Sequence, residues 1–406
     1  MTTIAIIGGG LAGAKTAEAL REQDFDGEVL LFGSEEHLPY ERPPLSKDYL
    51  SGNKSLPDFT VHTADWHLDH RVDVRPGTTV RSVDRESKSI VLPDDSRVGY
   101  DKLVLATGSS ARRLDLPGAD AAGVHLLRSY DDAAALSEAI GNSTRLAIVG
   151  GGWIGLEVAA SARTRRIEVA IAESAALPLQ AIMGDEVAEV FASLHREHDV
   201  DLRTSVSVDE IISSGGAATG IRLADGATIE ADTVLVAAGA VSELGLAQAA
   251  GLATGDGGVL VDAGLRSSDP DIFAVGDIAN AMHPILGHRV RVQHWANALN
   301  QPAVAATNLL GGDAQYTNLP YFYTDQYDLG MEYVGLADAD DEVVIRGDLA
   351  AREFVAVWCS SEGRVKAGMQ VNIWDQLDDL KALIGAAKPV DTDRLADSSI
   401  PLSQLH

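Results

Sequence analysis

The sequence predicts an α/β protein of several domains, from three observations. Short apolar runs that end in glycine alternate with segments rich in Ala, Leu, Glu and Arg, which is typical of strands alternating with helices in a parallel sheet. The pattern GGGxxGxxxA occurs twice, at residues 8–17 and 150–159, so the chain holds two copies of one strand–turn–helix unit. Beyond residue 316 apolar and polar residues alternate, as in antiparallel strands.

The composition limits the chemistry and the partners. The 406 residues include 32 Lys plus Arg and 60 Asp plus Glu, which gives a net charge of −28. This charge excludes nucleic acid and an anionic membrane surface as default partners, because phosphate binding relies on clustered positive charge. Cys359 is the only cysteine, so the chain can form neither an internal disulfide nor a cysteine-based metal site. Any redox chemistry must therefore come from a bound cofactor.

No signal peptide and no membrane-spanning run is expected. The first apolar stretch, Ile4 to Ile7, lacks a basic segment before it and leads directly into three glycines. No other run reaches the roughly 18 apolar residues that a membrane span needs. We therefore expect a cytoplasmic protein.

The predicted strands of the two repeated units all end at or near a glycine or an acidic residue. They are residues 4–8, 28–33, 102–108, 145–150, 167–173 and 232–239.

The first glycine turn predicts a dinucleotide site. Gly8 permits the tight turn after the strand, Gly10 lets the backbone approach a pyrophosphate, and Gly13 lets the helix pack on the sheet. The diphosphate would lie at the helix N-terminus, where free N–H groups meet it. Glu35 follows the next strand, where an acidic residue accepts hydrogen bonds from ribose hydroxyls.

The second glycine turn repeats this arrangement with Gly150, Gly152 and Gly155, followed by Glu173 after the next strand. A carboxylate there suits a free ribose 2′-hydroxyl and repels a 2′-phosphate, so NADH is favoured over NADPH. Two such sites in a chain with one cysteine indicate FAD in one and a nicotinamide cofactor in the other.

The C-terminal region predicts a third domain. Strands are expected over residues 320–328, 331–335, 342–348 and 353–360, followed by a helix over 375–389 and a loosely ordered tail from Asp391. We thus predict an FAD-binding domain from 1–108 and 245–316, an inserted NADH-binding domain from 109–244, and a mixed α/β domain from 317–406.

One histidine-rich segment, HTADWHLDH over residues 62–70, has no standard metal-ligand spacing. We interpret His62, His67 and His70 as part of a solvated segment and predict no metal site.

Several further motifs carry a family resemblance. LPYERPPLSK (38–47), the two glycine turns, ATG (106–108), AVGD (274–277) and VQHWANALNQ (292–301) occur in this order. The sequence resembles the FAD-dependent, NADH-oxidising ferredoxin reductases of the putidaredoxin reductase type. These are flavoproteins with two Rossmann-like dinucleotide-binding domains, as in glutathione reductase. The resemblance implies electron transfer from NADH through FAD to a [2Fe–2S] ferredoxin that serves a cytochrome P450 or a ring-hydroxylating oxygenase.

The resemblance also implies site residues. Lys47 is expected beside the flavin ring and near Glu157, and these two residues and Trp295 form the expected catalytic set. The expected FAD-binding residues are Gly8, Gly10, Ala12, Gly13, Glu35, Arg42, Lys47, Val80, Ala106, Thr107, Gly108, Arg128, Gly276, Asp277, Val292 and Trp295. The expected NADH-binding residues are Gly150, Gly152, Trp153, Ile154, Gly155, Glu157, Glu173, Ala238 and Gly239.

Alternatives and departures remain. Rubredoxin reductases and apoptosis-inducing-factor-like flavoproteins share much of the pattern, whereas a disulfide reductase would need a cysteine pair. The loop over 174–184 has none of the family's frequent arginines, and Gln293 stands where a glutamate is frequent. Because ferredoxins are usually acidic too, we expect a local basic patch at Arg289 and Arg291, unless these residues pair with nearby carboxylates. The protein is expected to be a monomer or a homodimer.

Overall fold

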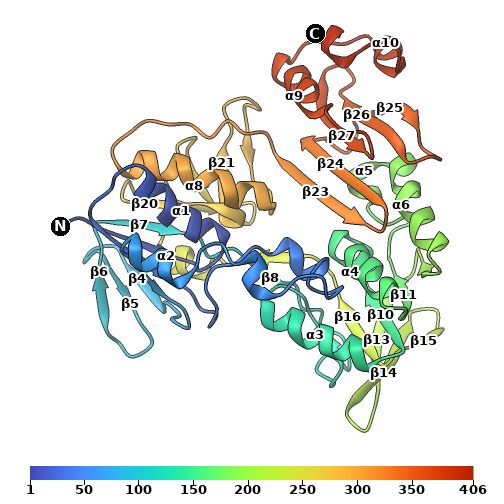
Figure 1. Ribbon diagram of the computed structural model, residues 1–406, viewed down its shortest axis with the longest axis horizontal. Helices are drawn as coiled ribbons and strands as arrows, with labels where there is room; N and C mark the ends of the chain where they lie inside the picture. Colours follow the sequence, from blue (N-terminus) through green and yellow to red (C-terminus); the bar gives the residue numbers. More distant parts are fainter. Residues whose placement is uncertain (406) are drawn as a thin grey trace. The chain divides into compact units, whose positions relative to one another are not determined.

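The computed structural model describes residues 1–405, which divide into two compact units (Figure 1). Unit 1 consists of Met1–Glu41, Leu56–Ser110 and Ala240–Pro320. Unit 2 consists of Arg42–Ser55, Ala111–Gly239 and the chain from Tyr321 onward. Each unit is therefore assembled from segments that are distant in the sequence.

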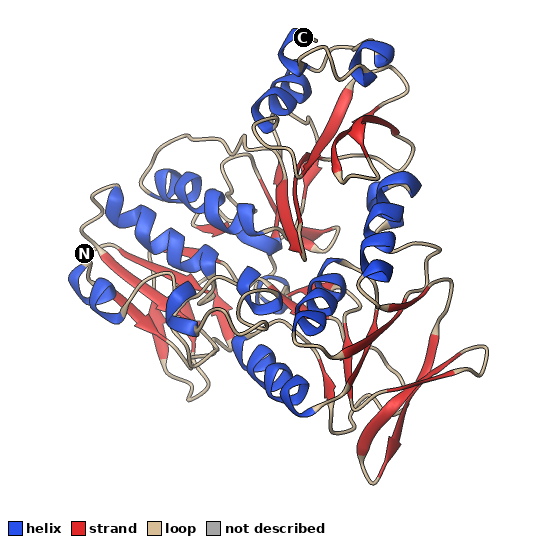
Figure 2. Ribbon diagram, turned by 45° about the vertical axis from the view of Figure 1, so that its right-hand side comes forward, coloured by secondary structure: helices blue, strands red, loops and turns tan. Residues whose placement is uncertain are grey.

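Unit 1 is built on a parallel sheet with the strand order β20-β7-β1-β2-β3. Its strands are β1 (Thr3–Ile7), β2 (Glu28–Phe32), β3 (Val72–Arg75), β7 (Lys102–Leu105) and β20 (Ile272–Ala274). The central strands are apolar after their first residue because both of their faces are covered, and Ile4 and Ile6 are almost completely buried. Helix α1 (Leu11–Glu22) packs on β1 and β2, and α8 (Trp295–Leu309) lies alongside α1 (Figures 1 and 2).

Smaller elements complete unit 1. They are η2 (Leu56–Phe59), α2 (Ala64–Asp69), β4 (Ser82–Asp84), β5 (Ser89–Val91), β6 (Arg97–Gly99), α7 (Gly245–Ala249), β18 (Thr254–Gly255), β19 (Gly258–Val261), η3 (Gly276–Ile278), β21 (Ala279–Met282) and β22 (Arg289–Val290). The chain leaves unit 1 after β8 (Ser109–Ala111) and returns at β17 (Ala240–Ser242), which pairs with β8.

The histidine segment is not simply solvated, as the sequence had led us to expect. The Trp66 ring stacks on His62, with centroids 3.7 Å apart, and on His70 at 4.2 Å. His67 is 2% exposed, and neither of its ring nitrogens has a hydrogen-bond partner. The prediction is wrong for His67, because α2 packs on β3 and this side chain is buried.

The first part of unit 2 is a parallel sheet with the order β12-β11-β10-β16-β9. Its strands are β9 (Val124–His125), β10 (Arg145–Val149), β11 (Glu168–Ala172), β12 (Asp201–Arg203) and β16 (Thr233–Val236). The helices around it are η1 (Pro43–Ser46), α3 (Tyr130–Asn142), α4 (Trp153–Thr164), α5 (Gln180–Met183) and α6 (Asp185–Glu197). An antiparallel sheet of β13 (Val208–Ser214), β14 (Ala217–Leu223) and β15 (Thr228–Glu230) adjoins it.

The C-terminal part of unit 2 is an antiparallel sheet with the order β23-β24-β27-β26-β25. Its strands are β23 (Tyr321–Gln326), β24 (Leu329–Gly335), β25 (Glu342–Asp348), β26 (Glu353–Cys359) and β27 (Val365–Val371). Helix α9 (Leu377–Ala386) packs on β24 and β27. We did not predict β27, the central strand, because Ala367 and Gly368 weaken its strand pattern; a Cβ on Gly368 would lie 2.6 Å from the Leu380 side chain of α9.

The expectation of a loosely ordered tail is wrong. Asp391 caps α10 (Thr392–Ala396), and the 3₁₀ turn η4 (Leu402–Gln404) follows. The Arg346 guanidinium of β25 donates hydrogen bonds to the carbonyl oxygens of Leu395, Asp397 and Ile400. Leu395 and Leu402 are buried. One buried cation and two buried leucines thus order a tail whose composition is polar.

Candidate cofactor sites

The glycine turn between β1 and α1 leaves open space at one position. A Cβ on Gly8 would lie 2.0 Å from Ala106 O, and a Cβ on Gly13 would lie 2.0 Å from Gly8 O, so protein packing itself requires these two glycines. A Cβ on Gly10 would meet no heavy atom within 4 Å. Gly10 is the N-cap of α1, and no side chain caps the helix there. The open position and the uncapped amides fit a diphosphate group.

The turn between β10 and α4 has the same construction. Gly150 has a φ of +105°, and a Cβ on Gly155 would lie 2.2 Å from Gly150 O. A Cβ on the N-cap Gly152 would meet no heavy atom within 4 Å, and no side chain caps α4. The second turn therefore fits a second diphosphate.

Glu173, directly after β11, fixes this second turn. Its Oε2 accepts a hydrogen bond from the Gly151 N–H at 2.6 Å, and its Oε1 accepts one from the Ala175 N–H at 2.7 Å. The carboxylate that the sequence assigned to a ribose thus also connects the glycine turn to the loop after β11.

In unit 1, a chain of hydrogen bonds leads to Asp277, which is 7% exposed in η3. Ser109 Oγ donates to Asp277 Oδ2 at 2.8 Å, and Gln293 Nε2 donates to Ser109 Oγ at 2.9 Å. Gln293 is thus connected to Asp277 through a serine that the sequence did not single out. Burial lowers the pKa of the neighbouring His294 to about 4, and the Asp277 charge opposes this shift.

In unit 2, Lys47 and Glu157 lie close together, as expected. Lys47 follows η1, Glu157 is buried on α4, and Lys47 Nζ is 3.4 Å from Glu157 Oε1. Glu157 also accepts hydrogen bonds from the hydroxyls of Ser46, which lies in the 38–47 motif but was given no role, and of Thr324, which no motif indicated. The functional roles of Lys47 and Glu157 stay predictions.

The other predicted residues divide between the units. Arg42 and Arg128 lie in unit 2, where the Arg42 guanidinium donates to Arg128 O. Every other predicted FAD residue except Lys47 lies in unit 1; Glu35 there accepts a hydrogen bond from the Tyr40 hydroxyl, and Trp295 is the first residue of α8. All of the predicted NADH residues lie in unit 2.

Trp153 and Ile154, at the start of α4, differ in their surroundings. The Trp153 ring packs against Phe191 and Phe322, with centroids 5.5 and 5.1 Å apart. Ile154 is 43% exposed. Of the two, Ile154 is the apolar side chain that remains available to a ligand.

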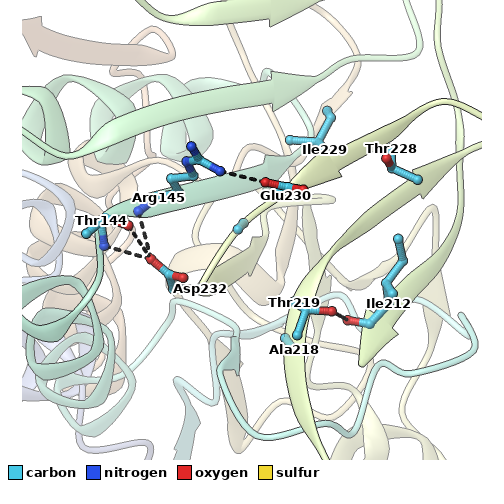
Figure 3. Close-up of a pocket in the computed structure, with 10 residues that line it drawn as sticks. Thr144, Arg145, Ile212, Ala218, Thr219, Thr228, Ile229, Glu230 and Asp232 are labelled. Atoms are coloured by element: carbon cyan, nitrogen blue, oxygen red, sulfur yellow. Dashed lines mark hydrogen bonds and ion pairs between the residues drawn. The ribbon is translucent and has the colours of Figure 1, made fainter. Parts of the chain in front are cut away.

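A separate hollow of about 430 Å³ lies beside β10, β14 and β15 (Figure 3). Its charged groups already have partners within the protein. Arg145 pairs with Glu168 and Glu230, and Asp232 accepts hydrogen bonds from the backbone N–H groups of Thr144 and Arg145. This hollow therefore presents no ready polar site for a ligand.

Among residues 1–405 no group of three or more His, Cys, Asp or Glu side chains could hold a metal ion. Over the same residues no helix is long and apolar enough to cross a membrane. A cytoplasmic location stays a prediction. Cys359 is buried in β26, and burial raises the pKa of its thiol to about 11, so it is unsuited to thiol redox chemistry.

Two glycine-turn dinucleotide folds and an antiparallel C-terminal sheet define an oxidoreductase class with two dinucleotide-binding domains, which confirms the predicted fold class. The chain belongs to the pyridine nucleotide-disulphide oxidoreductase family, whose model matches residues 2–301. A reductase C-terminal domain matches residues 321–406.

The named relatives confirm the predicted resemblance. The chain is 38% identical to the ferredoxin–NAD(+) reductase component of the anthranilate 1,2-dioxygenase system of Burkholderia cepacia, over 98% of this chain and 97% of that protein. It is 33% identical to putidaredoxin reductase of Pseudomonas putida, over 99% and 96% of the two chains.

Solved structures agree with these sequence relatives. The ferredoxin reductase for the CYP199A2 system from Rhodopseudomonas palustris matches with a TM-score of 0.95 and 33% identity, over 100% of this chain and 99% of that chain. The reductase in a covalent putidaredoxin reductase–putidaredoxin complex also matches with a TM-score of 0.95 and 33% identity, over 99% and 97% of the chains.

Proposed function

We propose that this chain is an NADH-dependent flavoprotein reductase that passes electrons through FAD to a [2Fe–2S] ferredoxin, which serves a cytochrome P450 or a ring-hydroxylating oxygenase. The observation that carries the proposal is the pair of open, uncapped glycine turns in a chain whose relatives are named ferredoxin reductases. FAD accepts two electrons together and releases them singly, which suits a one-electron acceptor.

The residues around the first turn would hold FAD. Gly10 and the N–H groups of α1 face the diphosphate, and Glu35 accepts from the adenosine ribose. Asp277 accepts from the hydroxyls of the chain between diphosphate and flavin, held in place by Ser109. The division into an FAD domain (1–108 and 245–316), an NADH domain (109–244) and a C-terminal domain (317–406) belongs to this proposal.

The residues around the second turn would hold NADH. Gly152 and the amides of α4 face its diphosphate, and Ile154 offers an apolar contact. The Glu173 carboxylate accepts from the 2′-hydroxyl and repels a 2′-phosphate, so NADH is the preferred nicotinamide cofactor.

Lys47 and Glu157 would adjust the charge beside the flavin. The Lys47 ammonium stabilises negative charge on the reduced ring, and the Glu157 carboxylate balances that cation when the ring is oxidised. Trp295 packs at the flavin edge. The protein needs no nucleophile, since its task is to orient the two rings and set their potential.

A direct test is the anaerobic titration of the purified protein with NADH. The protein should be yellow with FAD bound, and NADH should bleach the flavin absorbance at about two electrons per FAD. A protein that does not retain FAD, or FAD that NADH does not reduce, would contradict the proposal.

Arg289 and Arg291 are proposed to attract the acidic ferredoxin. Arg289 Nη1 donates to Val261 O and Asn280 O at 2.7 and 2.8 Å, and Arg291 Nε donates to Asp256 O at 2.9 Å. These acceptors are neutral carbonyl oxygens, so the two cations are held in place without being neutralised. This favours the basic patch over local pairing with carboxylates.

Charge variants test the patch. Replacing both Arg289 and Arg291 with Glu should lower the rate of ferredoxin reduction roughly tenfold or more at low salt, and should lower NADH–ferricyanide activity much less. The control with Lys at both positions keeps the charge and should stay near wild type. Equal losses with ferredoxin and ferricyanide would reject the docking role.

A further inference from the structure

The hydroxyl of Thr324, on β23 of the C-terminal sheet, contacts the Lys47–Glu157 pair. Thr324 is 1% exposed, and its Oγ1 donates to Glu157 Oε1 at 2.7 Å. The Ser46 hydroxyl donates to the other carboxylate oxygen, Oε2. Both oxygens of Glu157 therefore already accept a short hydrogen bond from a hydroxyl.

Lys47, in contrast, is held loosely. Its Nζ lies 3.4 Å from Glu157 Oε1, 3.9 Å from Asp325 Oδ2 and 4.4 Å from the centroid of the Tyr323 ring. A fully formed ammonium–carboxylate bond is roughly 2.7–2.9 Å long. The ammonium thus lies within the field of two carboxylates and one ring face without closing on any of them.

Thr324 and Lys47 share one acceptor, Glu157 Oε1, and the hydroxyl is 0.7 Å closer to it (3.4 − 2.7). Oε1 has more than one lone pair and accepts from both groups, but the hydroxyl is the nearer donor, so the ammonium shares the charge of this oxygen with Thr324. Removal of the hydroxyl would leave more of that charge to Lys47, which would then approach Oε1.

A buried polar chain fixes the direction of the Thr324 hydroxyl. Gln326 Nε2 donates to Thr324 Oγ1 at 3.2 Å, so the threonine proton is left to point at Glu157. Gln326 Oε1 lies 2.9 Å from Nε2 of His195 on α6. Burial lowers the pKa of His195 to about 4, so its ring is neutral near pH 7, and Nε2 carries the proton that the amide oxygen accepts.

We propose that Thr324 is a positioning residue: its hydroxyl, oriented by Gln326 and His195, occupies Glu157 and keeps the Lys47 ammonium only partly neutralised, available to the flavin. This inference rests on the proposed function, and it assigns a role in the flavin site to the C-terminal domain.

The first test measures the position of Lys47 and the reduction potential of FAD, and it needs no NADH. In Thr324→Val, which keeps the side-chain shape, a crystal structure should place Lys47 Nζ within roughly 3.0 Å of Glu157. The FAD potential, measured against a reference dye with enzymatic reduction, should shift to a more negative value, because a better-neutralised cation stabilises the reduced ring less. Thr324→Ser should restore both readouts. A potential that is unchanged or more positive would overturn the proposal.

The second test is kinetic. The limiting rate of FAD reduction by NADH should fall roughly tenfold in Thr324→Val, about the effect of one hydrogen bond to a charged group, with little change in NADH affinity. In a Glu157→Gln background the same substitution should have no further effect, because Thr324 acts through Glu157. If the two substitutions lower the rate of FAD reduction additively, Thr324 does not act through Glu157.

Matched variants separate positioning from folding. Thr233→Val removes another buried hydroxyl of unit 2, one that contacts Ser143, and should lower thermal stability without moving the potential. If Thr324→Val does not fold, Gln326→Met should shift the FAD potential in the same direction by a smaller amount. An unchanged potential in Gln326→Met would then reject the proposal. If NADH fails to reduce even the wild-type FAD, the proposed function falls while the potential series still tests Thr324.

Discussion

Glu173 holds its own glycine turn in place at the position where we propose that it also binds the nicotinamide cofactor. Its two oxygens accept from the Gly151 and Ala175 amides, which ties the glycine turn to the loop after β11. Residues 174–184 of that loop contain no charged side chain, so Glu173 is the charge that this segment places beside the glycine turn.

We predict that Glu173→Gln weakens NADH binding roughly tenfold, since one amide loses its acceptor, and narrows the preference for NADH over NADPH by a similar factor. Titration of both cofactors measures this. Glu168→Gln, at the start of β11, removes an equal charge from an exposed ion pair and should change the affinity for neither cofactor. If Glu173→Gln weakens both cofactors equally, the carboxylate only organises the turn.

Residues of the flavin site differ in how far the sequence could predict them. The contact between Lys47 and Glu157 was expected from the family resemblance, and the structure brings the two side chains together. The hydrogen bonds of Ser46 and Thr324 to Glu157 were not expected, although Ser46 lies in the 38–47 motif, because a buried hydroxyl becomes a donor to Glu157 only after three distant segments have packed together. A contact of this kind depends on tertiary structure, which no local pattern records.

At the scale of the elements, the two glycine turns combine a packing requirement with the proposed binding of a diphosphate, and single substitutions can separate the two. Gly13→Ala would place a methyl group 2.0 Å from Gly8 O and should destabilise unit 1 strongly. Gly10→Ala meets no protein atom, and its φ of −92° suits alanine.

We therefore predict that Gly10→Ala folds with a melting temperature for the FAD-free protein within roughly 2 °C of wild type, yet binds FAD at least roughly tenfold more weakly. Differential scanning calorimetry of the FAD-free proteins measures the melting temperature, and titration with FAD measures the affinity. Normal FAD affinity in Gly10→Ala would show that the open position does not face the diphosphate.

The sequence predicts the strands that contain a continuous apolar run. It does not predict the segments whose structure depends on contacts with distant parts of the chain. The parallel strands β1, β2, β10 and β11 are buried on both faces and read as apolar runs. The sequence does not predict β27, because its Gly368 weakens the strand pattern and is needed for the close packing of α9. It does not predict the ordered tail, because that order depends on hydrogen bonds from Arg346 of another strand.

At the scale of the whole molecule, three histidines with strongly lowered pKa values predict a loss of stability in mild acid. Burial lowers the pKa values of His67, His195 and His294 to about 4, below the usual 6.5. The unfolded chain therefore binds protons that the folded chain does not, and stability falls as the pH drops from about 6.5 towards 4.

His67→Leu tests this most simply, because the His67 ring nitrogens have no hydrogen-bond partner to lose. The variant should be less sensitive to acid, melting roughly 3 °C above wild type at pH 5 and closer to it at pH 8, by scanning calorimetry at constant salt. A pH dependence identical to that of wild type would show that His67 takes no part.

The central claim, that this chain is a ferredoxin reductase, is tested most directly by the anaerobic rate of electron transfer from NADH to a [2Fe–2S] ferredoxin encoded beside it, compared with a rubredoxin at the same salt. The account predicts fast reduction that is selective for the ferredoxin and weakens with salt, as the cationic patch at Arg289 and Arg291 requires. Equal or faster reduction of rubredoxin, or reduction of neither carrier while NADH still bleaches the flavin, would contradict it.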